Sequence, residues 1–313
     1  MSTWRRGSAI ALTLAVLCTE ARAQDPVAVL TELTPRTGEI QVHRVAEPGW
    51  IPAQPLLALR PGDAVRATAD ARAVLLYSGG VVQTVSAANS PVRIDVSARS
   101  SAQSVKALMG GIVEFLAGQR REPRYEPLSV RGLQIGPPRI VAPRDTRILP
   151  GPVALEWSGS PSLRYRVRLL GPEGTVWERG QIAGHRADPP APLLRPGTTY
   201  TWMLETPGQP AQRAQFEVLQ AAESGRVQQA LAGLQPESLA GYPPTTLTVM
   251  RAALLVRERL YADARNELLA GIAADTEAPV LHQLLGDVYE RTGLPDLAAE
   301  QFGQAHWLAR PRS

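Results

Sequence analysis

Residues 279–308, PVLHQLLGDVYERTGLPDLAAEQFGQAHWL, decide how the C-terminal part of the chain folds. Apolar residues recur there every three or four positions on both sides of Gly293, which is typical of two helices joined by a tight turn. Part of the pattern stands 34 residues earlier, and a weaker trace lies 34 residues before that. The corresponding positions are Gly293, Leu294, Ala298, Phe302 and Ala305, then Arg259, Leu260, Ala264, Leu268 and Gly271, then Gly225, Ala230 and Leu234. This period predicts stacked helical hairpins over residues 219–313.

The residues at these spacings resemble tetratricopeptide repeats, with Leu285-Gly286 and Tyr289 at the spacing of a first helix. The resemblance implies a concave groove lined by the first helices, which would bind a peptide or a partner helix. A helical face without a ligand is the alternative. The expected groove residues are Val249, Ala253, Val256, Arg257, Val280, Gln283, Asp287, Glu290 and Arg291. Two and a half repeats bury little core by themselves, so we expect them to dock on the preceding domain or to dimerise.

Residues 135–218 read as short strands, and apolar residues alternate with arginines from Tyr165 to Leu169. The segment Leu194-Arg-Pro196-Gly197-Thr-Thr-Tyr200 resembles the tyrosine corner of fibronectin type III domains. The resemblance implies a β-sandwich that acts as a spacer or a binding surface.

Residues 24–100 also read as short strands separated by turns such as Pro61-Gly62-Asp63 and Ser78-Gly79-Gly80. The order of Gly38, Leu57, Gly62-Asp63, Val65, Ala73, Leu75 and Ile94 resembles a FecR-type periplasmic domain. The resemblance implies an all-β envelope module that senses or binds partners. The predicted fold is therefore multidomain: a FecR-like β-domain, a fibronectin III-like sandwich and an all-α helical-repeat domain.

Residues 101–134 separate the two β-domains. Apolar residues from Val105 to Leu116 recur at helical spacing and predict an amphipathic helix that packs on the β-domain. A helix that binds a partner or a membrane surface is the alternative. The charged, proline-containing stretch that follows reads as a linker. Its Arg120, Arg121 and Arg124 are candidates for a cell-wall or lipid contact, with a solvated linker as the plainer interpretation.

Residues 1–23 have the pattern of a cleavable signal peptide: Arg5 and Arg6, an apolar stretch, and Ala21-Arg22-Ala23. We expect cleavage after Ala23 and a soluble protein in the bacterial periplasm. Cys18 is the only cysteine, so the mature chain would have neither disulfides nor cysteine nucleophiles.

Composition and motifs give little support to catalysis. The net charge of +4 is small for a nucleic-acid-binding protein, and hydrolase, metalloprotease and phosphate-loop motifs are absent from the sequence. His43, His185, His282 and His306 have no metal-ligand spacing. We therefore expect no metal and no cofactor, and a non-enzymatic adaptor that binds an envelope protein or peptide, in an oligomeric state that the sequence leaves open. The alternatives are a FecR-type ligand sensor and a cell-wall hydrolase or its activator.

Overall fold

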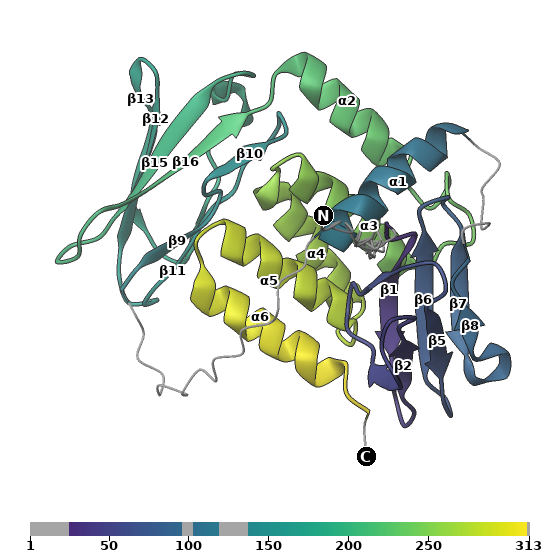
Figure 1. Ribbon diagram of the computed structural model, residues 1–313. Helices are drawn as coiled ribbons and strands as arrows, with labels where there is room; N and C mark the ends of the chain where they lie inside the picture. The colour runs from purple at the N-terminus through teal and green to yellow at the C-terminus, as the bar shows by residue number, and fades with distance from the viewer. Residues whose placement is uncertain (1–24, 96–102, 119–136, 312–313) are drawn as a thin grey trace, which may run out of the picture.

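The computed structural model describes residues 25–95, 103–118 and 137–311. Two β-rich parts, built mainly of antiparallel strands, are followed by a C-terminal part of five helices among the described residues. Figure 1 shows the C-terminal helices lying between the two β-rich parts. The predicted order of β-structure followed by helices is confirmed.

The N-terminal part consists of two four-stranded antiparallel sheets, ordered β4-β1-β6-β7 and β3-β2-β5-β8. Their strands are β1 (Ala28–Thr34), β2 (Ile40–His43), β3 (Trp50–Pro52), β4 (Ala58–Leu59), β5 (Ala64–Ala67), β6 (Arg72–Tyr77), β7 (Val82–Ser86) and β8 (Val92–Arg93). Burial alternates along β2 and β5, whereas the first four residues of β1 are all buried. A strand buried on both faces reads as a continuous apolar run, and β1 lies between its own domain and the helices.

Helix α1 (Gln103–Gly118) forms where the helical spacing predicts it. It contacts β1 and β6 on one side and α3 (Pro244–Arg257) on the other. Met109, Ile112 and Val113 are fully buried in this layer. The prediction that α1 packs on the β-domain is confirmed, and its contact with α3 goes beyond that prediction.

The middle part consists of a five-stranded sheet, β10-β16-β15-β12-β13, and a three-stranded sheet, β14-β11-β9. Its strands are β9 (Arg139–Ala142), β10 (Thr146–Ile148), β11 (Leu155–Ser158), β12 (Tyr165–Gly171), β13 (Gly174–Ile182), β14 (Arg186–Ala187), β15 (Thr199–Glu205) and β16 (Gln212–Val218). Trp157 and Trp202 are buried in the core of this part. The Tyr200 hydroxyl accepts a hydrogen bond from the Arg195 N–H at 2.8 Å and donates one to the Leu193 carbonyl at 3.1 Å.

The helical part comprises α2 (Ala221–Ala232), α3, α4 (Tyr261–Ala274), α5 (Pro279–Arg291) and α6 (Pro295–Leu308). Proline stands in the first turn of α3, α5 and α6. N–H groups in a first turn have no acceptor within the helix, so a proline there costs no hydrogen bond. Residues Ala264 and Ala298 are buried. A Cβ on Gly286 would lie 2.4 Å from a ring carbon of Phe302. Small residues therefore allow α5 and α6 to approach closely.

The helices share one hydrophobic core with α1 and with Val29 and Leu76 of the N-terminal sheet. The middle part has a separate core, and so does the space between the two N-terminal sheets. The C-terminal helices therefore pack on the preceding β-rich part, as expected, and also on the N-terminal β-rich part, which the sequence did not indicate.

Candidate functional site

The expected binding groove is the first candidate site, and the protein fills part of it with its own chain. Val249, Ala253, Val256 and Val280 are at most 4% exposed. The strand β1 contacts both α3 and α5, and α1 contacts α3. The prediction of an open groove is therefore wrong for these four residues, which are buried on helices that contact the N-terminal part.

The other five predicted groove residues lie closer to the surface. Arg257 and Glu290 are exposed, whereas Gln283, Asp287 and Arg291 are half-buried. The Arg257 guanidinium lies over α1, where a Cβ on Gly111 would come within 2.7 Å of its Nη1. Gly111 thus gives Arg257 room to cross the helix. These residues offer polar groups to solvent but no continuous apolar channel.

The N-terminal junction is the contact of β1 with the start of α3. Glu32 Oε1 accepts hydrogen bonds from the N–H of Thr246 at 3.0 Å and from its hydroxyl at 2.8 Å. The Thr31 and Thr246 hydroxyls are 3.0 Å apart, and both residues are fully buried. The pairing of β1 with β6 shifts between Leu30 and Glu32, so both polar side chains can reach the helix. A strand residue thereby satisfies a free N–H at a helix N-terminus.

Burial raises the pKa of Glu32, and nearby Asp275 acts in the same direction. The two hydrogen bonds from Thr246 oppose that shift. A hollow of about 240 Å³ adjoins the junction, lined by Glu32, Leu33, Thr34, Arg36, Thr245, Asp275, Glu277, Ala278 and Val280. Thr245 donates a hydrogen bond to Asp275 at 3.2 Å. The hollow has acidic and basic groups but no geometry that fixes a reacting atom.

The sandwich junction is the contact of β10 with α4. The Thr146 hydroxyl oxygen accepts hydrogen bonds from the N–H groups of Tyr261 at 2.8 Å and Ala262 at 3.3 Å, so it caps α4 from another domain. Asp263, in the first turn of α4, accepts a bond from the Leu149 N–H at 3.3 Å. Burial raises the pKa of Asp263 to about 6.

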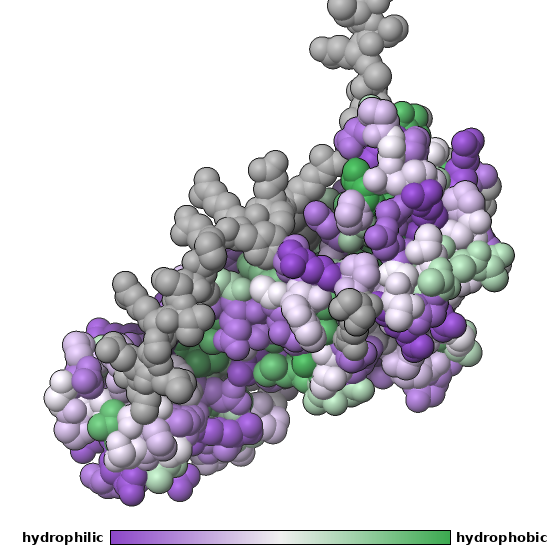
Figure 2. All heavy atoms as spheres, turned by 90° about the horizontal axis from the view of Figure 1, so that it is seen from below, coloured by the Kyte–Doolittle hydropathy of each residue, from purple (hydrophilic) through white to green (hydrophobic). Residues whose placement is uncertain are grey.

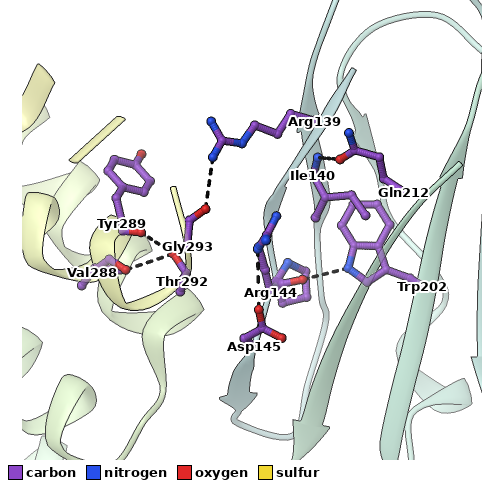
Figure 3. Close-up of polar contacts among 11 residues, drawn as sticks. Arg139, Ile140, Arg144, Asp145, Trp202, Gln212, Val288, Tyr289, Thr292 and Gly293 are labelled. Atoms are coloured by element: carbon purple, nitrogen blue, oxygen red, sulfur yellow. Dashed lines mark hydrogen bonds and ion pairs between the residues drawn. The ribbon is translucent and has the colours of Figure 1, made fainter. Parts of the chain in front are cut away.

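A second contact between the middle β-rich part and the C-terminal helices lies at the end of α5. Arginines of the middle part approach the turn from α5 to α6 there (Figure 3). Arg139 donates to the Gly293 carbonyl at 3.1 Å and forms an ion pair with Asp296 at 3.0 Å. A Cβ on Gly293 would lie 3.4 Å from Nη2 of Arg144. Positive charge at a helix C-terminus is favourable because the free carbonyls there carry partial negative charge. Arg265 of α4 also pairs with Glu156 at 2.8 Å.

The histidines and the buried aspartate considered as candidate site residues include several that lie in structural contacts. No group of three or more His, Cys, Asp or Glu residues there could hold a metal ion. His282 is buried and bonds to Gln301 at 2.8 Å, and His43 packs against Trp50. Asp63 is buried and accepts bonds from the Arg44 side chain and the Arg60 N–H, so it holds a turn together.

Several predictions fall outside what the structure describes. The signal segment and its cleavage site lie there, as do Arg120, Arg121 and Arg124 of the linker. Within the described residues, no helix is long and apolar enough to cross a bilayer.

Seen from below, the surface is mostly hydrophilic, with small and separate apolar areas (Figure 2).

The junction residues were missed by sequence reasoning. Thr31 and Glu32 interrupt an apolar run, and Asp263 stands in the first turn of a helix, where acidic residues are common. The polar interruption is a usable signal of a helix contact, but the residue it meets lies more than 200 positions away.

Compared with known proteins, the chain matches no family model and no curated sequence.

Proposed function

We propose that this chain is a non-enzymatic adaptor of the bacterial cell envelope. In this proposal the helical repeat holds two β-domains in a fixed arrangement, and their outer surfaces bind envelope proteins. The observation that carries the proposal is the filled groove: Val249, Ala253 and Val280 are fully buried, and their helices, α3 and α5, contact β1 of the N-terminal part. The repeat thus binds within the chain and leaves the outer faces of the β-domains for partners.

Three local features support the domain types that the proposal includes. The Tyr200 hydroxyl bonds to backbone groups five and seven residues upstream, as in a tyrosine corner. Close packing of Gly286 on Phe302 fits a tetratricopeptide hairpin. Buried Asp63 holds the turn of the FecR-like pattern. The signal-peptide pattern of residues 1–23 supports an exported protein.

A disulfide lock tests whether the groove has to open for function. Since the mature chain would contain no cysteine, the double variant Thr31→Cys, Thr246→Cys has a single pair to oxidise. The two hydroxyls are 3.0 Å apart, so cysteines at these positions would bring their sulfur atoms close together. Locked and reduced forms are used as baits on envelope extract, and bound proteins are identified by mass spectrometry.

We expect the locked and reduced forms to recover the same partners. Recovery by the reduced form alone would show that partners enter an opened groove, and the proposal would be wrong. Robust turnover by the purified chain in hydrolase assays, including cell-wall zymography, would also contradict it.

A further inference from the structure

Helix α6 presents one side to solvent along its whole length. Its main contact is with α5, and it lies at the outer edge of the helical part (Figure 1). Residues that alternate at steps of four and three stay on one side of a helix. On the solvent side of α6, the residues at these steps are all exposed. We call them the Trp307 stripe: Asp296, Glu300, Gly303, Trp307 and Arg310.

Trp307 is the most exposed large apolar side chain on the described helices. It is 61% exposed, against 37% for Leu269 of α4. Aromatic residues are enriched at protein interfaces and supply many of their hot spots. Gly303 stands one turn before Trp307, and a Cβ there would meet no atom within 4 Å. The stripe therefore combines an exposed ring with an open place on which a second ring can lie.

Charges of opposite sign stand on either side of this centre. Glu300 and Arg310 form no ion pair with another residue in the described ranges. They are ten residues apart, about 15 Å along the helix, so they do not pair with each other. The Arg310 guanidinium donates to Nε2 of His306. Burial and the charge of Arg310 lower the pKa of His306. The imidazole is therefore neutral at pH 7, and the charge of Arg310 is left uncompensated.

An antiparallel pair of α6 helices would satisfy these groups together. Glu300 and Arg310 are centred on residue 305, and so are Gly303 and Trp307. One two-fold axis near residue 305 therefore brings Arg310 of one copy to Glu300 of the other, and Trp307 of one copy onto Gly303 of the other. Each pair forms twice, and an interface of this kind closes at two copies.

We propose that the chain forms a two-fold dimer in which the Trp307 stripe packs antiparallel against the same stripe of a second copy. Charge complementarity favours a second copy as the occupant, because the stripe itself carries the charge that matches each of its own. Asp296 already pairs with Arg139 at 3.0 Å and lies outside the central contacts. The dimer goes beyond the adaptor function proposed above, and it would give the adaptor two copies of each outer surface.

Analytical ultracentrifugation of the chain over a range of concentrations measures the Kd of the dimer. The charge variants are Glu300→Arg, Arg310→Glu and the double variant that carries both changes. Trp307→Ala removes the ring. Arg213→Glu on β16 and Leu269→Ala on α4 are matched controls at exposed residues outside the stripe. Circular dichroism establishes that each variant is folded.

We expect the parent chain to form a dimer that each single charge reversal weakens at least about tenfold, because like charges then meet at two places. The double variant restores both ion pairs with inverted sign, so its Kd should return to within about threefold of the parent value. A folding defect would not be repaired in this way. Trp307→Ala should weaken the Kd at least about tenfold, and the two controls should change it less than about twofold.

Four outcomes would overturn the inference: a monomer at every concentration up to about 0.1 mM, a dimer that the stripe variants leave unchanged, a double variant that remains as weak as the single ones, or assemblies that grow beyond two copies. A monomer that still captures envelope proteins would refute the dimer and leave the adaptor function standing. A dimer that captures no envelope protein would do the opposite.

Discussion

Asp263→Asn should make the protein more stable at neutral pH. The carboxyl of Asp263 lies in the sandwich junction, where it accepts a bond from the Leu149 N–H. Burial is the largest influence on it and disfavours the charged form. An amide of the same shape keeps an oxygen for that N–H and removes the buried charge.

The size of the effect follows from the pKa. Burial raises the pKa of Asp263 from 3.8 to about 6, and each unit corresponds to about 1.4 kcal/mol, so the ionised group costs about 3 kcal/mol. Since the folded protein holds this proton more tightly than the unfolded chain, the stabilisation is complete below about pH 3.8 and is lost as the pH rises through about 6. Loss of the charge at the start of α4 subtracts about 0.3–1 kcal/mol. We expect the Asp263→Asn variant to gain about 2 kcal/mol at pH 7.5.

Urea unfolding of the chain, followed by circular dichroism at pH 4.5, 6 and 7.5, measures this effect. The advantage of the variant over the parent protein should shrink by about 2 kcal/mol between pH 7.5 and 4.5. Glu32, whose pKa is also raised, is present in both chains, so its contribution cancels in the difference. Glu237→Gln, a change of the same kind at an exposed residue, serves as the control. A difference that stays constant with pH would refute the reasoning.

Three further predictions concern single contacts, each measured as the free energy of unfolding. Glu32→Ala leaves the buried Thr246 N–H without its acceptor and should cost about 1–2 kcal/mol, whereas Glu39→Ala, at an exposed residue, should change little; equal effects would contradict a capping role. Gly286→Ala places a methyl group 2.4 Å from the Phe302 ring and should cost about 1–3 kcal/mol, while Gly303→Ala, with open space around it, should be neutral or slightly stabilising; the reverse order would be incompatible with the packing. Tyr200→Phe removes the acceptor of the Arg195 N–H and the donor to the Leu193 carbonyl and should cost about 1–3 kcal/mol, and a loss below about 0.5 kcal/mol would mean that these bonds are dispensable.

Local patterns in the sequence predicted the elements well. The period of 34 residues indicated α5 and α6, and apolar spacing indicated α1. Alternation indicated β2 and β12, in which inward side chains are buried and outward ones more exposed. No individual strand was expected at Ala28–Thr34, because β1 is buried on both faces and lacks alternation.

Contacts between distant segments could not be predicted in the same way. The apolar faces of Val249 and Val280 indicate burial, but a sequence does not say whether a ligand or another domain supplies the cover. Glu32 meets Thr246 across 214 residues, and Thr146 meets Tyr261 across 115. Such pairs depend on how domains pack, which no local period encodes.

The filled groove lowers the affinity of any partner that would bind in it, because the N-terminal part has to leave first. The N-terminal domain is tethered to the helices and shares their core, so it competes as an intramolecular ligand at high effective concentration. For a partner that binds only the open state, the apparent Kd equals the intrinsic Kd divided by the fraction of molecules that are open. If opening costs about 4 kcal/mol, for an apolar layer and a buried Glu32–Thr246 contact, affinity falls about a thousandfold. A surface on the outer side of a β-rich part carries no such penalty, because binding there leaves β1, α1 and α3 packed together. The same reasoning makes the Thr31–Thr246 lock decisive: a closed junction should leave binding at the outer face unchanged and abolish binding within the groove.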